Sequence, residues 1–90
     1  MNLEESFNLF WQAYPRKVAR KVARAVWGRL KPDEELIQII LQALEQHKKT
    51  EQWVKDGGIY IPHASTWLNQ ERWTDELQIE GQGSTKYKDI

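Results

Sequence analysis

The first apolar pattern in the chain covers residues 3–13. Its large side chains return every three or four positions and so share one helical face: Leu3, Phe7, Phe10, Trp11 and Tyr14. Pro15 pushes the residue before it out of the helical region of backbone space. The pattern therefore predicts a helix with an aromatic face that ends just before this proline.

The second pattern predicts a helix over residues 16–30. Its apolar face is defined by residues that recur every four positions: Val18, Val22, Val26 and Leu30. Basic residues occupy the opposite half of this helix, in an arc of about 140°; we call them the basic stripe, and they are Arg16, Lys17, Arg20, Lys21 and Arg24. Trp27 falls at the border between the two faces.

The third pattern, which begins at Asp33, is the most apolar part of the chain. Acidic residues at 33–35 are favoured at a helix start, and His47, Lys48 and Lys49 are favoured at a helix end, because each complements the helix macrodipole. The residues between them are rich in leucine and isoleucine. This segment is expected to be the central core helix.

The remaining sequence predicts shorter elements. Residues 51–55 either continue the third helix or form a separate turn around Trp53, and the Asp-Gly-Gly at 56–58 is a stop and turn signal. Residues 59–61 are expected to be extended because Pro62 follows them. A short helix should then begin after residue 62 or 63 and carry Trp67, packed into the core, together with Leu68.

These patterns predict an all-α fold of three main helices plus a short C-terminal helix. The helical domain is expected to cover residues 1–76. Apolar residues become sparse after that point, and two glycines and a serine appear at positions 81–84. Residues 77–90 are therefore expected to form a flexible tail.

Composition excludes several kinds of chemistry. The chain has 90 residues and no cysteine, which rules out disulfides, thiolate zinc sites and a cysteine nucleophile. Its two histidines, His47 and His63, have no metal-ligand spacing, and no set of nucleophile, base and carboxylate stands out. We expect no enzymatic activity, no metal, no cofactor and no small-molecule substrate. No apolar run is long enough to cross a bilayer and the N-terminus resembles no secretory signal, so we expect a cytoplasmic protein.

Charge is unevenly distributed along a chain whose formal net charge is zero. Residues 16–31 contain seven bases and no acid, whereas residues 32–90 contain eleven acids and six bases. A solvated helix face usually mixes both signs. The basic stripe therefore favours contact with the phosphates of nucleic acid, with Lys31 peripheral and with Trp27 and Arg72 as accessory contacts. A solvated face and an acidic protein partner are the alternatives to phosphate contact, and for the Trp27 ring packing is favoured over a contact role.

Two separated motifs resemble a known family. They are FWQAYPRK, followed by the alanine-rich basic helix with its tryptophan, and YIPHASTWLNQERW near the end. They resemble a small helical module found near the C-terminus of replication proteins of phages and prophages. The matching positions are Phe10, Tyr14, Pro15, Arg16, Lys17, Trp27, Tyr60, Ile61, Pro62, Thr66, Trp67, Leu68, Asn69, Arg72 and Trp73.

The resemblance implies a role in replication initiation or replisome organisation, through contacts with DNA or with a helicase or its loader. The leading hypothesis is thus a nucleic-acid-binding or replisome-associated module of phage or prophage origin. The alternative is a protein-interaction module: an adaptor to the helicase or loader, or a small phage inhibitor of a host nucleoprotein complex such as a CRISPR effector.

Overall fold

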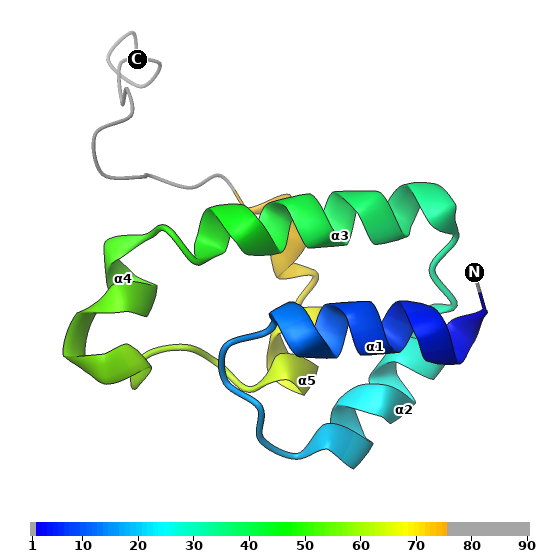
Figure 1. The fold of residues 1–90 in the computed structure, drawn as a ribbon, viewed down its shortest axis with the longest axis horizontal. Helices are drawn as coiled ribbons and strands as arrows, with labels where there is room; N and C mark the ends of the chain where they lie inside the picture. The colour runs from blue at the N-terminus through cyan, green and yellow to red at the C-terminus, as the bar shows by residue number, and fades with distance from the viewer. Residues whose placement is uncertain (1, 76–90) are drawn as a thin grey trace, which may run out of the picture.

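The computed structural model describes residues 2–75, and every regular element in this range is helical (Figure 1). The three longest elements are α1 (Leu3–Ala13), α2 (Arg20–Leu30) and α3 (Glu34–His47). The others are α4 (Glu51–Val54), the 3-10 helix η1 (Lys55–Gly58), α5 (Ala64–Asn69) and the 3-10 helix η2 (Arg72–Thr74). The predicted all-α class is confirmed, with α5 as the short C-terminal helix. The expected tail at 77–90 lies outside the described residues.

Helices α1 and α3 begin at local signals in the sequence. The Asn2 side chain accepts a hydrogen bond from the Glu5 backbone N–H, and the Glu5 carboxylate accepts one from the Asn2 N–H, which forms a capping box. The Asp33 side chain caps α3 by accepting a hydrogen bond from the Leu36 N–H at 2.8 Å. Both helices therefore lie where their sequence patterns predict them.

Helix α2 begins at Arg20, and the prediction of a helix from Arg16 was wrong at this end. The preceding residue, Ala19, has a left-handed backbone (φ 57°) and makes no side-chain cap. No acid stands in the first turn of α2, and the bases there oppose the helix macrodipole. Because nothing local fixes this helix start, it could not be located from the sequence.

The buried face of α2 also differs from the predicted one. Ala23, Val26 and Trp27 are buried, whereas Val18 is 42% exposed and Val22 is 53% exposed. The predicted apolar face followed the valine repeat. The helix is instead rotated to bury the tryptophan, which removes far more apolar surface from water than a valine does.

Aromatic rings from three helices form the centre of the core. Phe10 of α1 lies between Trp27 of α2 and Trp67 of α5, with ring-centroid distances of 5.2 and 5.9 Å. All three side chains have no exposed surface. In Figure 1, α1 crosses in front of α5, with α3 above and α2 below. The core role predicted for Trp67 is confirmed.

Residues 50–63 form a bent wall at one end of the molecule. Helix α4 is a separate element around Trp53, and Asp56 and Gly57 then adopt positive φ values of 53° and 67°. The expectation of an extended segment at 59–61 was wrong for Ile59, which has helical backbone angles (φ −68°, ψ −16°). After the left-handed turn at Gly57, the chain places Ile61 in the core.

Tyr14 joins this wall to α1. Its hydroxyl donates a hydrogen bond of 2.6 Å to the Pro62 carbonyl, and its ring is fully buried. Burial raises the pKa of Tyr14 above its ordinary value near 10, while Arg72 and Arg16 act in the opposite direction. The folded protein therefore holds this proton at a pH where the unfolded chain releases it.

Tyr14 should make the protein less stable at high pH. As the pH rises above about 10, the free energy of unfolding should fall by up to about 1.4 kcal/mol per pH unit from this group alone. The Tyr14→Phe variant should lack this contribution, and near neutral pH it should be about 1–3 kcal/mol less stable because the Pro62 carbonyl loses its donor. Denaturant unfolding between pH 8 and 11 measures both the stability of each protein and the dependence of that stability on pH. Parallel pH profiles for the two proteins would contradict the role assigned to Tyr14.

Candidate nucleic-acid interface

The five residues of the basic stripe do not share one helix face. Arg16 and Lys17 lie in the connection between α1 and α2, ahead of the helix. The Arg16 Nη1 donates to the Ile61 carbonyl at 2.8 Å, and the Lys17 Nζ donates to the Tyr14 carbonyl at 2.7 Å. The prediction that these two side chains continue the α2 stripe was therefore wrong, because both bind backbone carbonyls instead.

Arg20 and Arg24 point toward α1. Arg24 forms an ion pair of 2.9 Å with Glu4, while Arg20 donates to Asn8 at 2.9 Å and lies 4.0 Å from the same Glu4 carboxylate. The Arg20 guanidinium also lies over the Phe7 ring, 5.1 Å from its centroid. Two guanidinium groups on successive turns of α2 thus meet polar side chains on successive turns of α1. These cations hold the two helices together and are less available to an external anion.

Trp27 is enclosed by the fold. Its side chain has no exposed surface, and its Nε1 donates to the Ser6 hydroxyl at 3.0 Å. The core position of the ring agrees with the packing role that the sequence favoured for Trp27, and it excludes the accessory nucleic-acid contact considered beside it. Arg72 lies in η2, and its guanidinium donates to Asp75 and to Gln70.

The exposed side of α2 presents a different set of residues. We call it the outer α2 surface; it consists of Lys21, Val22, Ala25 and Arg29, continued by Lys31 at the helix C-cap. No carboxylate of residues 2–75 forms an ion pair with Lys21, Arg29 or Lys31. Of the predicted site residues, Lys21 and Lys31 are thus the two that are exposed and whose side chains have no partner among residues 2–75. The sequence pattern placed Arg29 off the stripe, and only the observed rotation of α2 brings it outward.

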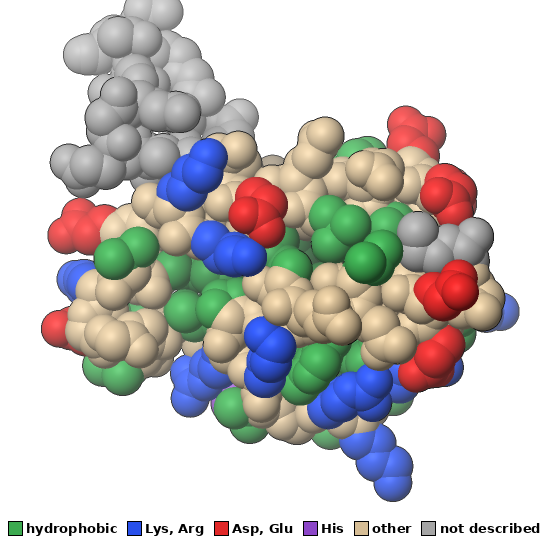
Figure 2. Space-filling view, in the orientation of Figure 1, with side chains coloured by type: hydrophobic (Ala, Val, Ile, Leu, Met, Phe, Trp, Pro, Cys, Tyr) green, Lys and Arg blue, Asp and Glu red, His purple; other side chains and the backbone are tan. Residues whose placement is uncertain are grey.

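The charge distribution makes this side of the molecule basic. In Figure 2, Lys and Arg side chains gather along the lower edge, where Figure 1 places α2 and the chain before it. Most of the acidic side chains in this view lie at the end where α1 and α3 begin. Glu71 lines a small hollow beside Arg29 without pairing with it. Glu4 is the one described carboxylate within ion-pair distance of residues 16–31.

Other candidate chemistry finds no support among the described residues. His47 is buried, with its Nδ1 3.0 Å from the Ala43 carbonyl and its Nε2 3.7 Å from Asp75. His63 is exposed at the start of α5. Within residues 2–75 no group of three potential ligands could hold a metal ion, and no helix is long and apolar enough to cross a membrane.

The sequence matches the model of a known protein family. The family model of the Legionella vir region protein LvrA C-terminal domain covers residues 2–71. No curated protein and no solved structure matches the sequence. The matched region includes the whole of α1 to α5, the first sequence motif, and the second motif as far as Glu71, but the family description does not mention replication.

Proposed function

The chain belongs to the family of the Legionella vir region protein LvrA C-terminal domain, and we propose that it binds the phosphate backbone of nucleic acid without catalysis. The observation that carries the proposal is the outer α2 surface. Three cations, Lys21, Arg29 and Lys31, stand there in solvent without an acidic partner among residues 2–75.

The spacing of these cations suits a nucleic-acid backbone. Lys21 and Arg29 are eight residues apart on one helix, which is about 12 Å along its axis. One strand of duplex DNA presents three or four phosphates over roughly this length. Each phosphate that a cation neutralises releases counterions, and this release provides affinity without reading the base sequence.

The surroundings add to the attraction. Arg16, Lys17, Arg20 and Arg24 keep their positive charge although they bind carbonyls or share Glu4, so they raise the potential over this side of the molecule. We assign direct phosphate contact to the three open cations and long-range steering to the other four. A replication complex, as the sequence motifs suggest, is the setting we propose for this binding.

The dependence of affinity on salt tests the proposal. The chain should bind a fluorescent DNA oligonucleotide, and the logarithm of its association constant should fall linearly with the logarithm of salt concentration, with a slope of about −2 to −3 for two or three phosphate contacts. Fluorescence anisotropy with duplex DNA, single-stranded DNA and RNA would show which form binds best. A polyglutamate chain is the matched polyanion control.

The proposal fails if no oligonucleotide binds at low salt, or if the affinity does not change with salt. Polyglutamate that binds as tightly as every oligonucleotide would point to an acidic protein as the partner of this surface.

A further inference from the structure

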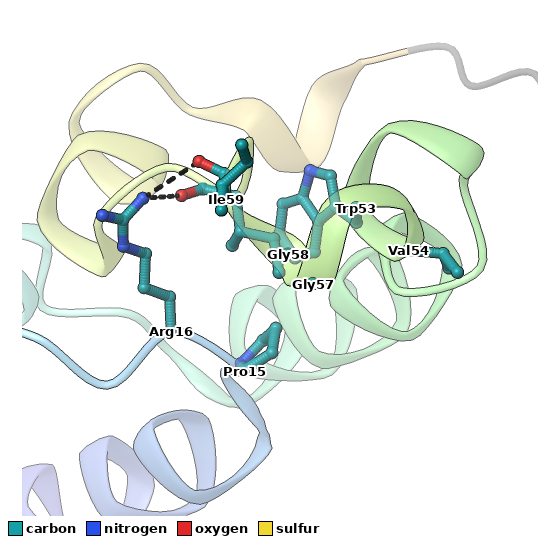
Figure 3. A pocket seen from close by; sticks show the side chains of 8 residues that line it. Pro15, Arg16, Trp53, Val54, Gly57, Gly58 and Ile59 are labelled. Atoms are coloured by element: carbon teal, nitrogen blue, oxygen red, sulfur yellow. Dashed lines mark hydrogen bonds between the residues drawn. The ribbon is translucent and has the colours of Figure 1, made fainter.

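A groove opens on the side of the molecule formed by α4 and η1. It has a volume of about 430 Å³, within the range of about 300–1,000 Å³ typical of ligand sites. We call it the α4–η1 groove; its lining residues are Pro15, Arg16, Trp53, Val54, Gly57, Gly58, Ile59 and Ile61. Figure 3 shows Arg16 at one edge and Val54 at the opposite edge.

The walls of this groove are fixed by specific contacts. The Arg16 Nη1 crosses from the α1–α2 connection and donates to the Ile61 carbonyl at 2.8 Å and to the Ile59 carbonyl at 3.4 Å (Figure 3). Trp53 packs edge-on against Tyr14, with ring centroids 5.6 Å apart, and is only 6% exposed. The groove is thus held open by bonds between its two sides, and a ligand would find it preformed.

The rim of the groove exposes apolar side chains. Val54 is 63% exposed and Ile59 is 62% exposed, and the neighbouring Tyr60 is 48% exposed. These three residues are close in the sequence and belong to one bent wall. Apolar groups gathered in this way mark a surface that gains stability when a partner covers it.

Arg16 determines which partner chemistry fits. Its guanidinium has five N–H donors, and only Nη1 is engaged, with two backbone carbonyls. No carboxylate of residues 2–75 pairs with it. A carboxylate would therefore find both charge and unused donors at this edge, next to an apolar wall.

We propose that the α4–η1 groove docks an extended segment of a partner protein, which places an aliphatic side chain between Val54 and Ile59 and a neighbouring carboxylate on Arg16. Nucleic acid fits this site poorly because Trp53, the aromatic residue of its lining, is buried and offers no open ring face for a base to stack on. The neighbouring Tyr60 ring lies outside the lining and has the Lys55 ammonium over it, 5.4 Å from its centroid. This inference goes beyond nucleic-acid binding, and it concerns a different surface from the outer α2 surface.

Selection from a phage-displayed library of random short peptides tests the inference. Peptides selected on the full chain, with counter-selection on an Ile59→Glu variant, should carry an aliphatic residue beside Asp or Glu. A selected peptide should bind the Ile59→Glu variant about tenfold more weakly or worse. Changing its acidic residue to the matching amide should weaken binding to the unmodified protein by a similar factor.

Two comparisons separate this site from the proposed nucleic-acid interface. A Lys21→Glu/Arg29→Glu protein should bind the peptides as the unmodified chain does, and the Ile59→Glu protein should keep its affinity for DNA. If Ile59→Glu lowers the melting temperature, Val54→Glu takes its place, since Val54 is equally exposed. The inference is overturned if no peptide is enriched, if enriched peptides bind both proteins equally, or if they carry basic residues instead of acidic ones.

Discussion

Trp27→Ala should remove about half of the free energy that stabilises the folded protein. Replacing a buried tryptophan with alanine costs about 3–5 kcal/mol through lost burial and the cavity left behind. Trp27 has no exposed surface and packs on both Phe7 and Phe10, so little can move in to fill the space. A domain of this size has a total stability of only about 4–11 kcal/mol. Circular dichroism with a urea titration would measure the loss.

A matched variant shows whether the effect comes from the core. Trp27→Phe keeps an aromatic ring but loses the Nε1 donor to Ser6, so it should be destabilised by a smaller amount, about 1–3 kcal/mol. If Trp27→Ala keeps its helicity and stability while it loses affinity for nucleic acid, the ring is a contact residue, and its assignment to the core is wrong.

Reversing two charges on the outer α2 surface should lower the affinity for DNA by about 100-fold near 0.1 M salt. Each lost phosphate contact reduces the magnitude of the salt slope by about one. Between 1 M and 0.1 M salt, one unit of slope corresponds to about a tenfold change in affinity. The variant is Lys21→Glu with Arg29→Glu, and fluorescence anisotropy gives the affinity and the slope together.

The fold of this double variant should remain intact. Both side chains are exposed, and neither forms an ion pair with residues 2–75, so substitutions there are expected to change stability by about 0.5 kcal/mol or less. If the double variant loses helicity, unfolding explains its loss of binding. In that case Lys21→Gln with Arg29→Gln, which introduces no new charge, should still lower the salt slope by about 2.

The sequence pattern located α1 and α3 correctly because their start signals are local. Asn2 and Asp33 lie at the helix starts they cap, and the residue before Pro15 ends the first helix through its own backbone. The ends of such helices depend on residues only a few positions away, so they can be predicted from a single sequence.

The start and rotation of α2 depend on distant residues. Arg16 binds the Ile61 carbonyl, 45 positions further along the chain, and Trp27 turns inward to meet rings from α1. No spacing within residues 16–30 encodes those partners, so the valine repeat predicted burial correctly at Val26 but wrongly at Val18 and Val22. The molecule has a basic side, as the sequence predicted. The exposed cations there whose side chains have no partner among residues 2–75 are Lys21, Arg29 and Lys31.

The α4–η1 groove could not be predicted from sequence either. Its two sides, around Arg16 and Ile59, are far apart along the chain and meet only because the left-handed turn at Gly57 folds the wall back. Arg16 belongs to the first sequence motif and Ile61 to the second. Their contact in the structure gives those positions a physical reason to occur together.

The most direct test of the proposed interface compares two double variants that carry the same total charge. One is Lys21→Glu/Arg29→Glu on the outer α2 surface, and the other is Lys49→Glu/Lys55→Glu at the exposed positions around α4. If DNA meets the outer α2 surface, the first should bind about 100-fold more weakly than the second near 0.1 M salt. Equal affinities for the two variants would show that total charge, and not this helix surface, governs binding.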